Sequence, residues 1–97
     1  MISEKKMSPV TGMLVIRNAR GLHTRPSTEV VKCAVGFKAD VKLYYQRCEA
    51  NAKSLLSVVM LAASKGARIR IKATGEDAAQ AVESLIQLAQ NNFNISY

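Results

Sequence analysis

The chain has 97 residues, which is room for one hydrophobic core and too little for a second. Its 48% hydrophobic and 22% charged residues are close to globular averages, which argues against a disordered or fibrous chain. Its net charge of +7 attracts nucleic acid, anionic lipid or an acidic protein surface.

The longest uncharged apolar run, residues 54–64, is about half of the roughly 20 residues that a bilayer span needs. The first residues carry no apolar signal segment. We therefore expect a cytoplasmic protein with no membrane insertion. Cys33 and Cys48 match no metal-ligand spacing and are expected to be reduced thiols. No cofactor is expected, and no metal either, since the chain has no second histidine.

The charge is polarised along the chain. Residues 1–72 hold all 14 basic residues and four acidic ones, a balance of +10, whereas residues 73–97 hold the other three acids. The basic excess therefore belongs to the first three quarters of the sequence.

The beginning of the chain predicts an arm, a strand and a helix. Residues 1–9 are polar and unpatterned and are expected to form a flexible arm. The partly β-branched apolar run after them predicts a strand over 12–17. A helix of about three turns should open just after His23, because Pro26 suits a first helical turn and Gly36 a carboxyl-terminal cap.

The middle of the chain predicts a β-hairpin. Apolar and polar residues alternate over 40–45, which indicates a half-buried strand. A short strand over 48–51 is expected to follow it. The turn between them would use Gln46 and Arg47, although neither favours the positive φ that two-residue hairpin turns usually need.

The densest apolar block of the chain covers residues 55–63. Ser54 before the block and Gly66 behind it are helix start and stop signals, which predict a helix between them. Only Ser57 interrupts the block, which is more apolar surface than one side of a short helix buries. We therefore expect part of it to stay exposed as a contact patch.

The last third predicts a strand and a helix. Residues 68–73 alternate isoleucine with Arg or Lys, which indicates a strand with one wet face. Apolar residues then recur at helical spacing over 78–89. The order β-α-β-β-α-β-α predicts an α+β open-faced sandwich, in which a four-stranded, mostly antiparallel sheet carries three helices on one face.

The only histidine lies where the chain can bind an anion. His23 sits at the mouth of the first predicted helix, whose backbone N–H groups and dipole favour a phosphate. Arg25 adds a bidentate donor, and Pro26 fixes the backbone of the first turn. A neutral imidazole at this position carries a nitrogen lone pair that could attack phosphorus. From the residues alone, a capping or surface histidine remains the alternative.

These motifs resemble HPr, the histidine-containing phosphocarrier family of the bacterial phosphoenolpyruvate-dependent phosphotransferase system. Gly-Leu-His-Thr-Arg-Pro at 21–26 is followed by Ala-Lys-Ser-Leu-Leu at 52–56 and by Lys-Gly at 65–66 before a strand. The resemblance covers about residues 10–91 and leaves 92–97 as a carboxyl-terminal tail. It implies a phosphoryl carrier with a phosphohistidine intermediate, which is not a free-standing enzyme.

The resemblance also implies residue roles and partners. His23 matches the histidine that enzyme I phosphorylates and that then passes the group to enzyme IIA domains, and Arg25 matches the arginine that positions it. Ser54 matches the serine that a dedicated kinase, HPr kinase/phosphorylase, modifies in some bacteria, although it also suits a helix N-cap. The remaining expected residues are Thr24, Pro26 and Arg20 in the phosphate-supporting loop, and Leu55, Leu56, Val59 and Lys53 on the partner-docking surface. We expect a monomer.

Two other functions stay open at this stage. Within the family, the chain could be a regulatory paralogue, in a nitrogen-type phosphotransferase branch or as a kinase-controlled co-regulator. Outside it, the cations of Arg68, Arg70 and Lys72 could bind nucleic acid. No aromatic residue interleaves with them to stack on bases, so no nucleic-acid partner is expected.

Overall fold

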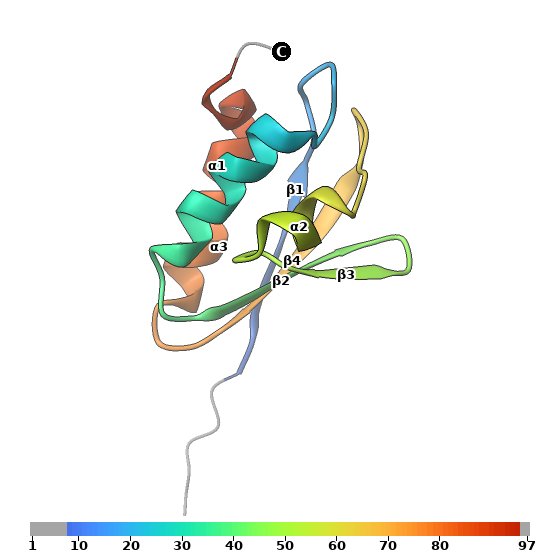
Figure 1. Cartoon of the computed structure of the whole chain (residues 1–97). Coiled ribbons are helices and arrows are strands. Elements are labelled where there is room, and N and C mark those ends of the chain that lie inside the picture. Colours follow the sequence, from blue (N-terminus) through green and yellow to red (C-terminus); the bar gives the residue numbers. More distant parts are fainter. Residues whose placement is uncertain (1–7, 96–97) are drawn as a thin grey trace, which may run out of the picture.

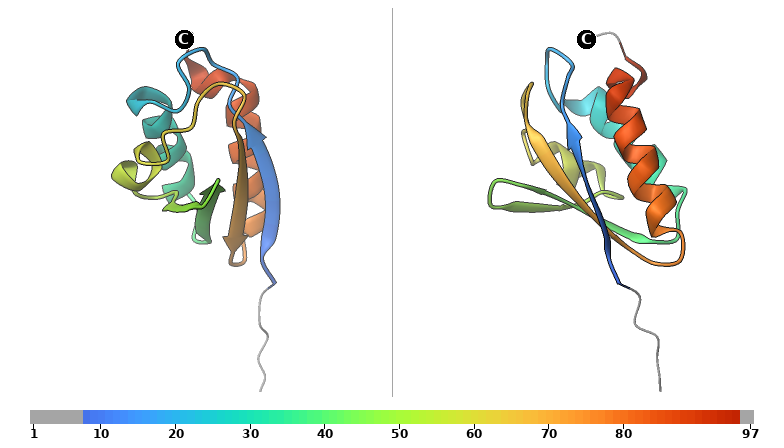
Figure 2. Two further views of the ribbon diagram at one scale, coloured as in Figure 1. Left: turned by 90° about the vertical axis from the view of Figure 1, so that its right-hand side faces the viewer. Right: turned by 180° about the vertical axis from the view of Figure 1, so that it is seen from behind.

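An open antiparallel sheet organises the computed structural model, which describes residues 8–95 (Figure 1). Its strands are β1 (Val10–Val15), β2 (Asp40–Tyr45), β3 (Cys48–Asn51) and β4 (Arg68–Thr74), in the spatial order β1-β4-β2-β3. Helices α1 (Thr24–Val35), α2 (Leu55–Val59) and α3 (Ala78–Gln90) cover one face, and the 3₁₀ turn η1 (Asn92–Asn94) follows α3 (Figure 2). The expected α+β open-faced sandwich is confirmed.

Period-two burial divides the two faces of the sheet. Central strand β4 buries Ile69 and Ile71 completely and exposes the basic residues between them. Helix α3 lies against β1 and β4 on the buried side. Gly12 allows this close approach, because a Cβ atom there would lie 2.5 Å from Cγ1 of Val82.

The first strand is shifted relative to the prediction. It covers Val10–Val15, whereas the apolar run predicted 12–17. Its extent follows its pairing with β4, from Val10 opposite Ala73 to Val15 opposite Arg68. The partner strand therefore fixes the boundary.

The second helix is much shorter than the apolar block predicted. Helix α2 ends at Val59, and Ala62 has a φ of +52° that turns the chain. The turn buries Leu61 and Ala63 in the core, at 5% and 3% exposure. A helix continued to Gly66 is therefore wrong, because these contacts override the local helical pattern.

The structure departs from the expected carboxyl-terminal tail, whereas most of the expected amino-terminal arm lies outside the described residues. Residues 1–7 of the arm lie outside the described residues, whereas Ser8 and Pro9 are exposed. Within the expected tail at 92–97, Phe93 is fully buried in the core and Ile95 packs against it. Residues 92–95 thus belong to the folded unit.

The hairpin forms as predicted despite its unusual turn residues. Tyr45 pairs with Cys48, and Gln46 adopts a φ of +56°. Both cysteines are free thiols, and burial raises the pKa of the Cys33 thiol. No helix in residues 8–95 is long and apolar enough to cross a membrane.

The carboxylate of Asp77, directly before α3, joins this helix to the turn between α1 and β2. Asp77 accepts hydrogen bonds from the backbone N–H groups of Lys38 and Ala39, both at 2.8 Å. The bond from Lys38 is the main cause that holds the pKa of Asp77 below its ordinary value. Gly75 allows the approach, since a Cβ atom there would lie 2.7 Å from the Cα of Ala39.

We predict that Asp77→Asn lowers the melting temperature at neutral pH. A carboxyl whose pKa falls on folding stabilises the fold above its unfolded pKa, and this stability is lost as the pH falls through the folded value. The deficit of the variant should therefore be largest above about pH 4 and shrink below it. Thermal unfolding from pH 7 to pH 2 measures the difference.

The matched control is Glu76→Gln, which removes the same charge from the exposed neighbouring residue. It should leave the melting temperature nearly unchanged at every pH. An equal deficit in both variants, or a deficit of Asp77→Asn that does not depend on pH, would contradict the prediction.

Candidate functional site

His23 is the residue immediately before helix α1. Its backbone is extended, with φ −81° and ψ −168°, and its carbonyl accepts the N–H of Ser27 at 3.0 Å. The side chain is partly buried and its Nε2 atom is enclosed. The imidazole therefore lies at the positive end of a three-turn helix.

The loop before His23 is fixed by hydrogen bonds to a distant segment. The N–H of Leu22 donates to the carbonyl of Ala63 at 2.8 Å. Within the loop, Nδ2 of buried Asn18 donates to the carbonyl of Gly21 at 2.7 Å. Gly21 has a φ of +72°, and a Cβ atom there would lie 2.6 Å from the Ala63 oxygen. This loop therefore positions His23 relative to the chain after α2.

A shallow hollow of about 330 Å³ opens beside the histidine. The residues that line this His23 hollow are Arg20, Leu22, His23, Thr24, Val59, Ala62, Ala63 and Ser64. Four expected site residues therefore share one depression: His23, Arg20, Thr24 and Val59.

The other expected loop residues lie on the first turn of α1. Arg25 is exposed and does not line the His23 hollow. Pro26 is buried, and so is Ser27, whose hydroxyl donates to the carbonyl of Leu22 at 3.3 Å. The arginine is thus available to a group arriving from solvent, whereas the proline anchors the turn.

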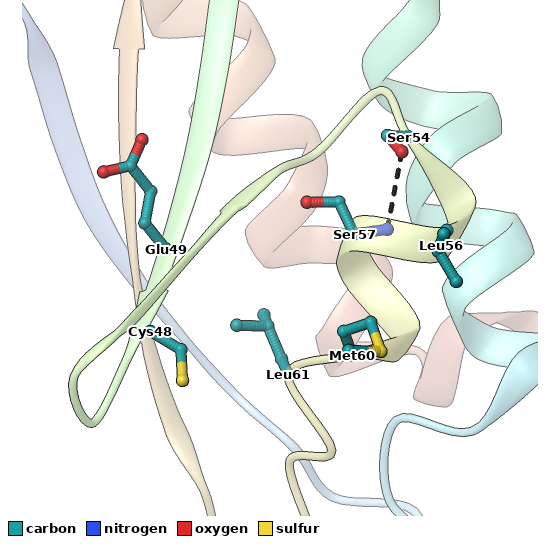
Figure 3. Close-up of a pocket in the computed structure, with 7 residues that line it drawn as sticks. All are labelled: Cys48, Glu49, Ser54, Leu56, Ser57, Met60 and Leu61. Atoms are coloured by element: carbon teal, nitrogen blue, oxygen red, sulfur yellow. Dashed lines mark hydrogen bonds between the residues drawn. The ribbon is translucent and has the colours of Figure 1, made fainter.

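Ser54 caps the short helix α2 beside a second hollow. Its Oγ accepts the N–H of Ser57 at 3.4 Å (Figure 3). The Ser54 hollow has a volume of about 440 Å³ and is lined by Cys48, Glu49, Ser54, Leu56, Ser57, Met60 and Leu61. It lies between α2 and the β2–β3 hairpin (Figure 3).

The apolar block around α2 divides between core and surface. Val58 is fully buried. Leu56 and Met60 are 72% and 71% exposed, and Leu55 is 40% exposed. An apolar surface of this kind on a small protein indicates a contact with another molecule.

Lys53 has a structural role that the sequence pattern did not indicate. Its Nζ donates to the carbonyl of Phe37 at 2.8 Å, just beyond the carboxyl end of α1. A cation there is favoured by the helix dipole. Lys53 therefore joins the start of α2 to the end of α1, in addition to any part in docking.

Asn18 was missed by the sequence reasoning, although it is 4% exposed and holds the loop that carries His23. An asparagine followed three residues later by glycine is typical of a tight turn. This Asn–Gly spacing is too common in proteins to have identified Asn18 as a site residue by itself.

Comparison with known proteins identifies the family. Residues 10–91 match the family model described as PTS HPr component phosphorylation site. The chain belongs to the HPr family. It is thus a phosphocarrier of the phosphotransferase system, as the motif around His23 suggested.

Individual HPr relatives agree in sequence and fold. The phosphocarrier protein HPr of Xylella fastidiosa (strain 9a5c) is 38% identical over 81 residues, which cover 84% of this chain and 91% of that protein. The multiphosphoryl transfer protein of Haemophilus influenzae is 42% identical over 79 residues, 78% of this chain but 16% of that longer protein. The crystal structure of HPr-C-His from Thermoanaerobacter tengcongensis has a TM-score of 0.82 at 30% identity, with 94% of this chain and 100% of that chain covered.

We predict that Gly21→Ala destabilises the protein more than Gly66→Ala. Both glycines have positive φ, but a Cβ atom at Gly66 meets nothing within 4 Å. Backbone strain alone should cost about 1–2 kcal/mol at Gly66, whereas strain and overlap with Ala63 should cost about 3 kcal/mol at Gly21. Urea unfolding measures both free energies, and equal losses would contradict the packing described for the loop.

Proposed function

We propose that the protein accepts a phosphoryl group from enzyme I on His23 and donates it to enzyme IIA domains. The observation that carries this proposal is the position of the only histidine, at the amino end of α1 and on the wall of the His23 hollow. The match of residues 10–91 to the HPr family model supports it. The protein acts in the cytoplasm as a monomer.

The nucleophile is Nδ1 of His23, because the other ring nitrogen, Nε2, is enclosed. The lone pair of Nδ1 attacks phosphorus while the bond between phosphorus and the donor breaks. The same exchange in reverse transfers the group to the acceptor, so no net proton or electron is consumed. The backbone N–H groups of Thr24 and Arg25, the first two residues of α1, face the phosphoryl oxygens, since they lie too early in the helix to have a partner within it.

Two guanidinium groups stabilise the added charge from different sides. Arg20 lines the His23 hollow, and Arg25 projects from the first turn of α1. Arg25 positions the phosphoryl group by bidentate hydrogen bonds, and Arg20 supplies a second positive charge. Thr24 contributes the first N–H of the helix, and Pro26 holds the turn rigid. Together they hold the group firmly enough to carry it and weakly enough to release it.

Partners dock on the exposed apolar surface next to the histidine. Leu55 and Leu56 project from α2, and Val59 lines the His23 hollow itself, so this apolar surface continues to the nucleophile. Lys53 supports the surface through its bond to Phe37. An acidic partner surface complements the surrounding cations and is steered toward them.

Phosphorylation of Ser54 by an HPr kinase/phosphorylase regulates this docking. Ser54 lies at the start of α2 and shares its hollow with Leu56. A phosphate there agrees with the dipole of the helix, so the fold tolerates it. The added negative charge instead repels acidic partners, which slows the relay.

We predict that incubation with phosphoenolpyruvate and enzyme I gives an acid-labile phosphoprotein, and that His23→Ala abolishes it. Arg25→Ala should be labelled roughly tenfold or more slowly. The control Arg47→Ala removes an exposed arginine from the β2–β3 turn and should be labelled at the normal rate. Labelling is followed by mass spectrometry, and ¹⁵N NMR identifies the phosphorylated ring nitrogen. Equal labelling of His23→Ala would refute the proposal.

We predict that Ser54→Asp raises the KM of enzyme I for this protein by roughly tenfold, because like charges meet at the interface. Ser54→Asn keeps a capping side chain without the charge and should behave as the wild type. Gln87→Glu adds the same charge at an exposed site on α3 and should have little effect. If Gln87→Glu raises KM as much as Ser54→Asp, charge on the docking surface is not the cause.

A further inference from the structure

The face of the sheet opposite the helices carries a cluster of cations that the phosphoryl relay does not use. Arg68, Arg70 and Lys72 occupy alternate positions of the central strand β4, and all three are exposed. Figure 2 shows that no helix covers this side. Side chains at alternate strand positions lie about 7 Å apart on one face, so the three charges form a row.

Strand pairing places further contact residues on both sides of this row. Arg70 lies between Met13 of β1 and Tyr44 of β2. Lys72 lies between Thr11 and Lys42 in the same way. A hollow of about 390 Å³ lies between Thr11, Tyr44, Arg70 and Lys72. We call these four residues, with Arg68 and Met13, the open-face cluster.

The charge of this cluster is only partly balanced, because two carboxylates, Asp40 and Glu49, share a neighbouring hollow with Tyr44 and Lys72. Glu49 forms an ion pair with Lys42, at 3.2 Å, and Lys32 forms one with Glu29; neither involves Arg68, Arg70 or Lys72. Lys72 lies directly opposite Lys42, whose charge is already paired with Glu49. An anionic partner would therefore act mainly on Arg68 and Arg70, at the end of the row away from these carboxylates.

We propose that the open-face cluster docks an acidic segment of a partner protein. Arg, Tyr and Met are the residues enriched at the centres of protein interfaces, and Met13, on the edge strand β1, is 48% exposed directly opposite Arg70. Single-stranded nucleic acid fits less well, because Tyr44 is the only aromatic ring in the cluster and several are needed for base stacking. Contacts between the cations and the phosphate groups of a nucleic acid do not replace this base stacking.

The position of the cluster gives this contact its functional value. Helices α1 and α2 lie on the other side of the sheet, so a partner on the open face does not cover His23 (Figure 2). The protein can therefore hold a second, acidic partner while its histidine exchanges a phosphoryl group. This contact does not depend on the proposed relay.

The test is an NMR titration of the full chain with a synthetic poly-glutamate peptide and, separately, with an oligouridylate of equal charge. The peptide should shift amide signals of β1, β4 and the adjoining part of β2, and should bind more tightly than the oligouridylate. Arg70→Gln with Lys72→Gln should weaken peptide binding roughly fivefold. The control pair Lys32→Gln with Lys38→Gln, which removes two exposed cations elsewhere, should weaken it less than about twofold.

Four results would overturn the proposal. They are the absence of peptide binding at low salt, signal shifts centred on the amino end of α1, equal weakening by the two double variants, and tighter binding of the oligouridylate than of the peptide. Absence of binding would show that the cluster binds no acidic peptide. Shifts at α1 or equal weakening by both double variants would show that the peptide responds to charge elsewhere or to the net charge of the protein. Tighter binding of the oligouridylate would assign this face to nucleic acid. Signals of buried residues in each variant verify that the fold is intact.

Discussion

The backbone contact between the loop before His23 and the chain after α2 determines the geometry of the whole site. One hydrogen bond, from Leu22 to Ala63, joins segments that are far apart in sequence. Gly21 packs so closely on the same carbonyl that no larger residue fits. Because a helix directs its free N–H groups along its axis, fixing its first residue also fixes where these groups point. This contact brings His23 and the apolar surface of α2 to the same part of the molecule.

The elements that follow local rules could be predicted from the sequence. Strand β4 alternates apolar and charged residues, and α3 repeats apolar residues at helical spacing, so each pattern has one structural solution. The length of α2 could not be predicted. Its apolar block is helical in pattern throughout, but Leu61 reaches the core only if the chain turns at Ala62. The burial of Phe93 could not be predicted either. It depends on the packing of α1 and α3 around η1, and the local sequence around Phe93 does not indicate that packing.

Residues of the candidate site could be predicted where their side-chain chemistry is distinctive. Residues that contribute through backbone hydrogen bonds could not be predicted. His23 and Arg25 stand out because a histidine and an arginine at a helix start favour phosphate chemistry. Asn18 and Ala63 do not stand out, since one orients a turn and the other offers only a carbonyl. Lys53 appeared to be a surface cation, whereas its ammonium group is used at the end of α1. Such roles exist only once distant segments have met.

The basic charge of the chain acts as two separate fields. Arg20 lines the His23 hollow and Arg25 lies two residues beyond the histidine on α1, whereas Arg70 and Lys72 lie on the face that the helices leave uncovered. At physiological ionic strength, exposed charges are screened over about 8 Å. A layer of helices packed on a sheet is thicker than that, since even stacked sheets lie about 10 Å apart. A partner approaching one face therefore responds mainly to the cations on that face, and a single net charge can serve two different contacts.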